Sequence, residues 1–448
     1  MKKKINFIFL IFLAILYSAD NSYILAQSPD ELKQRREIIL QKMEPGSVLV
    51  IKGNKGTGEF DDFKQDYNFY YLTGLNEPNG ALIMVAPGGR FRGNTETLFM
   101  MEQTGNPDWE AQTLGLEGGK DKLGFGSVLP SEEFQKEFEN ILSGRLTLLY
   151  MDYERSSGLH SPLTVDEDLF KKAREKGSDF DIRSPSGLVN PLRRIKSKYE
   201  IETIQTAVNI TGEAHKEAAR SIKPGMFEFQ LQAIIEHVFH INGAKRAGFN
   251  SIVGSGPNTC ILHWSENSRK MQDGDLVVID IGAEYNMYTA DITRTIPVSG
   301  KFTERQKDIY NIVLAAVTAA AEKLKPGVSF NEATGTGMDT LADGLIKLGM
   351  IRDRSEVRKY CYHGIGHNIG LYVHDVGGMG ILEPGMVFTI EPGLYIKEEG
   401  FGVRIEDNFL ITETGYIRLS ENIPRTVQEI EKLAEEESLG FERYLIKK

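Results

Sequence analysis

Three of the chain's eight histidines lie in one stretch, His363-Gly364-Ile365-Gly366-His367-Asn368-Ile369-Gly370-Leu371-Tyr372-Val373-His374-Asp375. Three glycines are interleaved with them, and glycine lowers helix propensity and lets another group approach the backbone closely. Few structural cores combine so much imidazole with so little side-chain bulk. The stretch therefore indicates a metal site or a substrate-binding loop, and we expect its glycines to leave room for the substrate.

Upstream of this stretch, a predicted β-hairpin carries two aspartates. Its strands are residues 275–281 and 287–293. With the hairpin centred between Tyr285 and Asn286, Asp280 and Asp291 face each other, and their Cβ atoms are roughly 4.5–5.5 Å apart. Like charges at this separation destabilise a sheet, so the pair requires a shared proton or a cation.

A second predicted hairpin lies downstream and repeats this construction. Its strands are residues 386–391 and 402–406. Centring it between Glu398 and Glu399 places Glu391 opposite Glu406, and strand alternation puts Arg404 on the same face as Glu406. Clustered ionisable groups of this kind are typical of functional sites. We therefore favour a metal site over two coincidental acid pairs.

A metal site built from these residues would be rich in oxygen ligands. Four carboxylates with one or more imidazoles suit Mn²⁺, Co²⁺ or another divalent ion. Two ions roughly 3.5–4 Å apart can activate a shared water and polarise a carbonyl, which is the chemistry of hydrolysis. The zinc-protease signature His-Glu-x-x-His and the serine-hydrolase signature Gly-x-Ser-x-Gly are absent from the sequence.

Length and element pattern predict two domains of the α/β (α+β) class. At 448 residues the chain exceeds the usual size of one domain. A turn-rich segment, residues 183–191, follows an α/β region. After it, the order helix, Lys-Pro-Gly, helix occurs twice, around residues 223–225 and 325–327. This repeat indicates an internal duplication.

Local patterns also predict the individual elements. Helices are expected over residues 28–43, around 131–142, over 198–222 and 230–241, and from Thr303 and Ser329 onward. Thr303 with Gln306, and Ser329 with Glu332, match the capping-box pattern. Strands are expected over residues 47–51, 69–73, 81–85, 97–101 and 146–150.

The first residues have the layout of a secretory signal peptide. A basic start, residues 1–4, precedes an apolar run over residues 5–17, and small residues follow at Ala19 and Ala26. The run is too short for a comfortable membrane span. We expect cleavage after Ala26, no stable membrane span thereafter, and an exported protein, periplasmic or secreted. Cleavage after Ala19 and an uncleaved membrane anchor are the alternatives.

Charge and cysteine content argue against other classes of protein. With 52 basic and 63 acidic residues the formal net charge is −11, whereas nucleic-acid binding needs a basic face. The two cysteines, Cys260 and Cys361, are too few for a disulfide framework. We interpret them as buried, inert thiols.

The acidic residues and one histidine together resemble a known ligand set. In this order, Asp280, Asp291, His367, Glu391 and Glu406 are similar to the five metal ligands of the pita-bread metallopeptidases. The similarity is greatest to the bacterial aminopeptidase P family. It extends to residues 66–78, 250–256, 261–267 and 382–386.

This resemblance implies a domain order and a reaction. A signal peptide (residues 1–26) would precede a non-catalytic N-terminal domain (residues 27–183) and an internally duplicated pita-bread catalytic domain (residues 192–448). The reaction would be metal-dependent hydrolysis of the N-terminal Xaa-Pro bond of peptides. Two divalent ions are implied, with Mn²⁺ expected and Co²⁺ or Zn²⁺ as alternatives, as is a homo-oligomer. The rival functions are prolidase, which cleaves Xaa-Pro dipeptides, and a non-catalytic peptide-binding homologue.

The resemblance also implies a role for each metal-site residue. Asp280 and Asp291 would bind the metals, and Asp291 and Glu406 would bridge them. His367 and Glu391 would complete the shell of the second ion. Glu391 would in addition act as general base.

Four further residues would bind the peptide. His263 and His374 would orient the substrate and stabilise the tetrahedral intermediate, and His363 and Arg404 would line the pocket. The link over residues 376–381 is shorter than in several relatives, which bears on the rim of the pocket and on the preferred peptide length.

Overall fold

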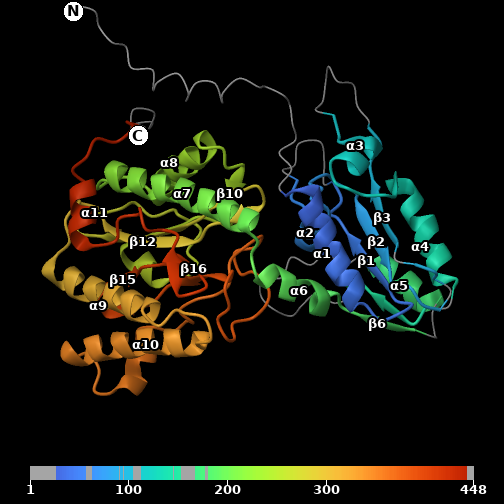
Figure 1. The fold of residues 1–448 in the computed structure, drawn as a ribbon. Helices are drawn as coiled ribbons and strands as arrows, with labels where there is room; N and C mark the ends of the chain where they lie inside the picture. Colours follow the sequence, from blue (N-terminus) through green and yellow to red (C-terminus); the bar gives the residue numbers. More distant parts are fainter. Residues whose placement is uncertain are drawn as a thin grey trace, which may run out of the picture. The chain divides into compact units, whose positions relative to one another are not determined.

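The computed structural model describes residues 27–56, 63–89, 91–93, 95–103, 112–144, 146–152, 167–176 and 180–440. The predicted signal peptide lies outside them. The chain divides into two compact units, Met1–Pro185 and Ser186–Lys448, and each is described by itself (Figure 1). The division falls inside the predicted boundary segment. From Ser186 onward that segment is helical rather than a turn, because Leu188 and Val189 are buried in helix α6 (Ser186–Arg194).

The N-terminal unit is built on a six-stranded mixed sheet with the order β4-β3-β2-β1-β5-β6. Its strands are β1 Val48–Lys52, β2 Ala81–Val85, β3 Thr95–Met100, β4 Val128–Pro130, β5 Leu148–Tyr150 and β6 Asp181–Arg183, and its helices are α1 Pro29–Lys42, α2 Tyr67–Thr73, α3 Gly115–Asp121, α4 Phe134–Leu142 and α5 Glu167–Lys176. Helices α4 and α5 cover the sheet face that carries Val48 and Val50, and α1 and α2 lie on the other face (Figure 1). Four of the five predicted strands and both predicted helices are confirmed here.

The predicted strand over residues 69–73 is wrong, because these residues belong to helix α2. Asp66 caps this helix by accepting a hydrogen bond from the backbone N–H of Phe69 at 2.8 Å, and Gly74 ends it in the left-handed region with φ 70°. All seven residues of α2 are buried. A short run that is buried all round carries no periodicity that separates a helix from a strand.

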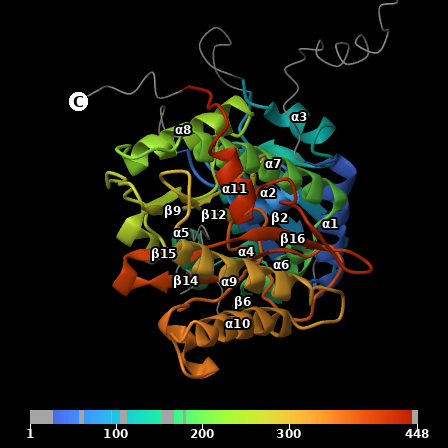
Figure 2. The same cartoon turned by 90° about the vertical axis from the view of Figure 1, so that its left-hand side faces the viewer.

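The second unit has strands between two pairs of helices (Figures 1 and 2). Helices α7 (Lys198–Ser221) and α8 (Glu228–Ile241) form one pair, and α9 (Glu304–Ala321) and α10 (Phe330–Lys347) form the other. The predicted repeat is therefore present as two helix pairs, each with a glycine at positive φ in its turn, Gly225 at 91° and Gly327 at 84°. The capping box at Thr303 is confirmed, whereas Ser329 makes no side-chain cap, so that prediction is wrong.

Short sheets fill the layer between the helix pairs. They have the orders β12-β9-β8, β11-β10-β7, β13-β16-β17 and β14-β15. The strands are β7 Arg246–Ala247, β8 Ile252–Ser255, β9 Leu276–Ile281, β10 Ala283–Tyr285, β11 Tyr288–Thr289, β12 Ile292–Pro297, β13 Val387–Ile390, β14 Gly393–Ile396, β15 Phe401–Arg404, β16 Asp407–Ile411 and β17 Tyr416–Arg418, and helix α11 (Val427–Leu433) follows them. Among the described residues, no helix is long and apolar enough to cross a membrane.

Candidate metal centre

The first hairpin has a different register from the predicted one. Thr293, not Asp291, lies opposite Asp280 in the β9–β12 pair. The turn consists of Asn286 and Met287, both at positive φ (45° and 71°), as a two-residue hairpin turn of type I′ requires. The centre is thus one residue later than predicted, and the two aspartates are diagonal neighbours rather than directly opposed.

The second hairpin has the predicted register. Gly393 pairs with Arg404 and Ile390 pairs with Asp407, so Glu391 and Glu406 lie across from each other where both strands are interrupted. In this gap, the N–H of Glu391 donates to the carbonyl of Ile365 at 3.1 Å. The N–H of Glu406 donates to the carbonyl of Thr293 at 3.1 Å. The interruption therefore ties the second hairpin to the histidine stretch and to the first hairpin.

The histidine stretch runs alongside β13 in an extended form. The N–H of Thr389 donates to the carbonyl of His367 at 2.8 Å, and the N–H of Ile369 donates to the carbonyl of Val387 at 3.1 Å. The Thr389 hydroxyl in turn accepts a hydrogen bond from the N–H of His367 at 3.1 Å. These contacts hold His367 beside the second hairpin.

Two of the glycines in this stretch serve the packing of the protein itself. A Cβ atom at Gly366 would lie 2.3 Å from the carbonyl oxygen of Thr389, and one at Gly370 would lie 2.2 Å from Oδ2 of Asp375. Only at Gly364, among these three, would a Cβ meet no atom of the described residues within 4 Å. The expectation that the glycines leave room for a substrate is therefore wrong for Gly366 and Gly370.

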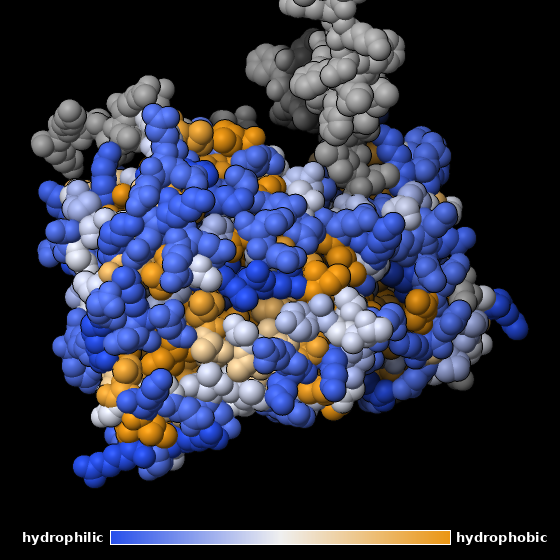
Figure 3. Space-filling view, turned by 60° about the vertical axis from the view of Figure 1, so that its left-hand side comes forward, coloured by the Kyte–Doolittle hydropathy of each residue, from blue (hydrophilic) through white to orange (hydrophobic). Residues whose placement is uncertain are grey.

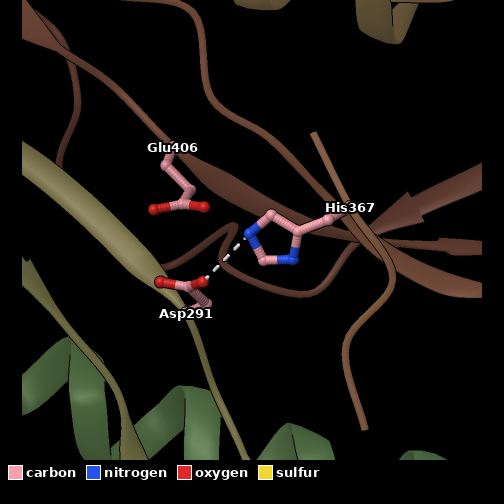
Figure 4. Close-up of side chains that lie close together, drawn as sticks. All are labelled: Asp291, His367 and Glu406. Atoms are coloured by element: carbon pink, nitrogen blue, oxygen red, sulfur yellow. Dashed lines mark ion pairs between the residues drawn. The ribbon is translucent and has the colours of Figure 1, made fainter. Parts of the chain in front are cut away.

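Three predicted ligands converge on one point (Figure 4). Asp291, His367 and Glu406 each offer one ligand atom, and these atoms all lie within 4.8 Å of one another. Nε2 of His367 is 3.4 Å from Oδ2 of Asp291 and 3.4 Å from Oε1 of Glu391. The two hairpins and the histidine stretch thus contribute side chains to a single cluster.

Two oxygens at this cluster test whether a cation fits. Oδ1 of Asp280 and Oε1 of Glu406 are buried, and among the residues that the structure describes none donates a hydrogen bond to either oxygen. Their partner oxygens are occupied, since Arg404 donates to Oδ2 of Asp280 at 2.6 Å and Thr293 donates to Oε2 of Glu406 at 2.8 Å. Leaving buried acceptors without partners costs free energy, and a divalent cation would satisfy both. The residues present therefore fit a metal site.

The electrostatics of the cluster also favour a cation. Burial raises the pKa of Asp291 and of Glu406 well above the ordinary range, and the charges of neighbouring carboxylates add to the rise. Burial, followed by the charge of Glu406, raises the pKa of Glu391 to about 8. Without a metal these groups resist ionisation, and a bound cation would favour their charged form.

A hydrogen-bonded chain extends from the cluster to a second histidine. Arg404 donates to the Tyr395 hydroxyl at 3.1 Å, and this oxygen is 2.9 Å from Nε2 of His363. Burial, with the charge of Arg404, lowers the pKa of His363 to about 4, so its imidazole is neutral at pH 7. Sequence reasoning missed Tyr395. The position of Tyr395 in its strand would have indicated it. Gly393 pairs with Arg404, and Tyr395 lies two residues after Gly393, so strand alternation puts the side chains of Tyr395 and Arg404 on the same face.

The remaining predicted substrate residues lie at the same site. The ring of His374 stands edge-on to that of His367, with centroids 4.3 Å apart. His263 is exposed and near enough to His363 for its charge to lower the pKa of that residue. Tyr362 donates its hydroxyl to the carbonyl of Cys260 at 2.5 Å, which joins the segments that carry His263 and His363.

The surface of the molecule is mixed. Hydrophilic residues predominate on the face shown in Figure 3, and hydrophobic residues emerge in patches. Ile261, which is 49% exposed, and Tyr362, which is 37% exposed, are among the large hydrophobic residues at the surface. Cys260 and Cys361 are both free and buried, as predicted.

Comparisons with known proteins agree with this fold and site. Residues 202–413 match the model of metallopeptidase family M24, and residues 32–150 match that of the aminopeptidase P N-terminal domain. The chain is 37% identical over 437 residues to the Xaa-Pro aminopeptidase of Escherichia coli (strain K12), covering 91% of this chain and 98% of that protein. It is 35% identical over 396 residues to an Xaa-Pro dipeptidase of Pyrococcus furiosus, covering 87% and 98%.

Solved structures show the same relationship. Zinc-substituted E. coli aminopeptidase P in complex with product superposes with a TM-score of 0.80 at 34% identity, covering 91% of this chain and 98% of that one. Fold and site together define a metallopeptidase that uses divalent metal. The chain belongs to metallopeptidase family M24, and its fold is an N-terminal α/β domain followed by a pita-bread domain, as expected. Both family matches lie inside the ranges 27–183 and 192–448, whose boundaries stay predictions.

Proposed function

We propose that this chain is an aminopeptidase that removes the first residue from peptides whose second residue is proline. The observation that carries the proposal is the convergence of Asp291, His367 and Glu406 beside buried carboxylate oxygens that accept no hydrogen bond. The presence of the aminopeptidase P N-terminal domain supports the choice of reaction. So does the similarity to the E. coli Xaa-Pro aminopeptidase over nearly the whole chain.

The proposed metal ligands are Asp280, Asp291, His367, Glu391 and Glu406. Carboxylates of this number can share two cations, and oxygen-rich sites suit Mn²⁺, with Co²⁺ and Zn²⁺ as alternatives. When bound, such ions act as Lewis acids toward a water molecule and toward the peptide carbonyl. The other steps of the reaction depend on side chains of this chain.

Glu391 is the proposed general base. Burial, followed by the charge of Glu406, raises its pKa to about 8, and a bound cation would favour the charged form that can accept a proton. Oε1 of Glu391 faces His367 at 3.4 Å, and Oε2 is 3.9 Å from Nδ1 of His363. A carboxylate in this place can take the proton of the attacking water and deliver it to the departing nitrogen of proline.

The histidines and Arg404 are proposed to hold the peptide. His263 and His374 orient the substrate. His363 acts by orientation, because one ring nitrogen is bonded to Tyr395 and the other to the carbonyl of Gly364 at 2.7 Å. Arg404 donates hydrogen bonds to both Tyr395 and Asp280, which hold its side chain in one position at the edge of the pocket.

A peptide-length series tests the proposed reaction. Purified protein loaded with Mn²⁺ is expected to release the first residue of Xaa-Pro-Yaa and longer peptides, and chelation is expected to stop the release. Cleavage of Xaa-Pro dipeptides alone would instead establish a prolidase. The similarity to the Pyrococcus Xaa-Pro dipeptidase is the reason to test this alternative. Metal-loaded protein that binds these peptides without cleaving them would establish the non-catalytic alternative.

Two further properties are proposed from the sequence. The layout of residues 1–26 supports export, with cleavage after Ala26. N-terminal sequencing of protein from cell fractions tests this, and intact Met1 in the cytosolic fraction would contradict it. A homo-oligomer is proposed from the family resemblance, and light scattering of the purified protein measures it.

A further inference from the structure

Asp375, the last residue of the histidine stretch, is the centre of a buried ion network outside the proposed ligand set. Its Oδ1 accepts a hydrogen bond from Arg193, and its Oδ2 is 3.4 Å from the ammonium group of Lys196. The three side chains are 2%, 4% and 1% exposed, in that order. Burial lowers the pKa of Lys196, and the charge of Asp375 opposes this fall.

Glu200 supplies the second negative charge of this network. Its charge also opposes the fall in the pKa of Lys196. Oε1 of Glu200 accepts a hydrogen bond from the Tyr288 hydroxyl at 3.0 Å, and Oε2 accepts one from the N–H of Ser197 at 2.9 Å. Two cations and two carboxylates thus balance in a buried environment. Apolar residues can often replace a buried ion network without loss of stability. We therefore explain the presence of this network by the conformation that it imposes on the surrounding backbone, and not by a gain in stability.

The backbone beside this network makes hydrogen bonds to the segments that carry two proposed ligands. The N–H of Asp375 donates to the carbonyl of Asn368 at 3.0 Å, which closes the loop between His367 and His374. The carbonyl of Gly370, inside that loop, accepts a hydrogen bond from the N–H of Thr289 at 3.0 Å. Thr289 lies two residues before Asp291, so the loop is fastened to the segment that leads to a proposed ligand.

Gly370 packs directly on the Asp375 carboxylate. A Cβ atom there would lie 2.2 Å from Oδ2 of Asp375 and 3.2 Å from Cε of Lys196. The carboxylate cannot move away from its two cations without becoming an unpaired buried charge, which is strongly unfavourable. The loop over residues 368–375, which packs on this carboxylate, therefore has one favoured position. The imidazole of His374 belongs to this loop and is positioned with it.

We propose that Asp375, held by Arg193 and Lys196, is a positioning residue that places the His374 imidazole beside His367 and so orients the peptide substrate. This inference rests on the proposed function, in which His374 binds substrate. Asp375 acts through the backbone of residues 368–375 and not by touching the peptide.

The variant Asp375→Asn keeps the shape and removes the charge. We expect kcat for an Xaa-Pro-Yaa tripeptide to fall about 10- to 100-fold, the usual cost of losing a group that orients a site residue, while metal content by elemental analysis stays constant. Gly370→Ala, which forces a methyl group onto the carboxylate, is expected to have the same effect. Glu217→Gln is the matched control, because Glu217 is a buried carboxylate of the same unit that bonds Ser221 and the N–H of Leu439.

A double variant separates positioning from stability. Asp375→Asn with Lys196→Met removes one charge of each sign, so the melting temperature should return toward that of the parent protein. A kcat that stays low in the double variant supports positioning. A kcat that recovers with the melting temperature, or an unchanged kcat in Asp375→Asn alone, overturns it.

Crystal structures of the parent protein and of Asp375→Asn give a test that needs no turnover. Displacement of the His374 ring from its 4.3 Å separation from His367 supports the inference, and an unchanged separation overturns it. Failure of the metal-loaded parent protein to cleave any Xaa-Pro peptide would count against the proposed function alone, because the structural comparison still decides whether Asp375 positions the loop.

Discussion

Arg404 donates to one oxygen of Asp280 at 2.6 Å and leaves the other, Oδ1, buried and without a hydrogen bond. The guanidinium also donates to the hydroxyls of Tyr395 and Thr293. One planar group therefore holds three side chains in place: a proposed metal ligand, the tyrosine that is hydrogen-bonded to His363, and a threonine of the first hairpin. A lysine at this position would keep the charge but could not make these contacts together, since its ammonium lacks the rigid fork of donors.

We therefore expect Arg404→Lys to reduce kcat/KM about 10- to 100-fold and to weaken metal binding, as measured by activity during a Mn²⁺ titration. Arg305→Lys is the control, because Arg305 makes a similar forked contact with Glu399 at the surface. An equal loss in both variants would show that the effect is general and would contradict the role of Arg404.

Glu391→Gln is expected to lower kcat by roughly 10²–10⁴-fold, the usual contribution of a general base. Asp291→Asn should lose bound metal as well, because Asp291 lies inside the three-ligand cluster. Metal analysis of the two variants beside steady-state rates distinguishes the two roles. Normal metal content and normal rates in both variants would refute the site assignment.

Metal removal should lower the stability of the catalytic unit. The buried carboxylates repel one another without a cation, and a metal that binds only the folded state adds about 2.7 kcal/mol at one hundred times its dissociation constant. Thermal unfolding with Mn²⁺ and with a chelator measures the difference. In Asp291→Asn the two melting curves should coincide, and an undiminished metal effect in that variant would contradict the prediction.

The glycines of the histidine stretch allow a matched comparison. Gly366→Ala should destabilise the protein by about 1–3 kcal/mol, because the methyl group meets the Thr389 carbonyl at 2.3 Å. Gly364→Ala, two residues earlier, should change stability by less than about 0.5 kcal/mol, since no atom of the described part of the chain lies within 4 Å of the new atom. Urea unfolding measures both, and equal losses would contradict the packing argument.

The N-terminal unit should show a pH dependence caused by Asp152. Burial raises the pKa of this carboxyl from 3.8 to about 6, with the Ser184 hydroxyl opposing the rise. The folded state therefore holds the proton more tightly than the unfolded state, and stability is lost as the pH rises from about 4 through 6. The loss reaches roughly 3 kcal/mol, from a shift of about two units.

Asp152→Asn removes this titration. Above pH 6 the variant should be more stable than the parent protein by up to roughly 3 kcal/mol. Denaturant unfolding at pH 4.5 and pH 7.5 measures the change. Asp181→Asn, which alters an exposed carboxylate of the same unit, is the control and should follow the parent protein at both values. A constant difference between Asp152→Asn and the parent protein across this range would contradict the assignment.

Much of the architecture was predictable from local patterns. Capping residues and apolar periodicity located α1, α7, α8 and α9, and strand alternation with the polar turn located the register that brings Glu391 opposite Glu406. The identity of the acidic and histidine residues was sufficient to predict a divalent-metal site, because few other arrangements tolerate carboxylates on apolar strands.

Other features arise only from tertiary contacts. Helix α2 is buried on every side, so its sequence lacks a helical period. The first hairpin turns at Asn286 and Met287, and a methionine at positive φ is not a signal that local propensity provides. For both elements, packing outweighs the preference of the local sequence.

The sequence by itself indicated the four carboxylates and the histidine stretch from which the proposed metal ligands come, because acid pairs on apolar strands require a shared proton or a cation. It did not indicate Tyr395. Only the tertiary structure decided how the proposed ligands are held. Arg404 reaches Asp280 across 124 positions of sequence, and Arg193 reaches Asp375 across 182. Such contacts follow from the packing of separate hairpins and loops around two buried clusters of charge, and no local period of the chain encodes them.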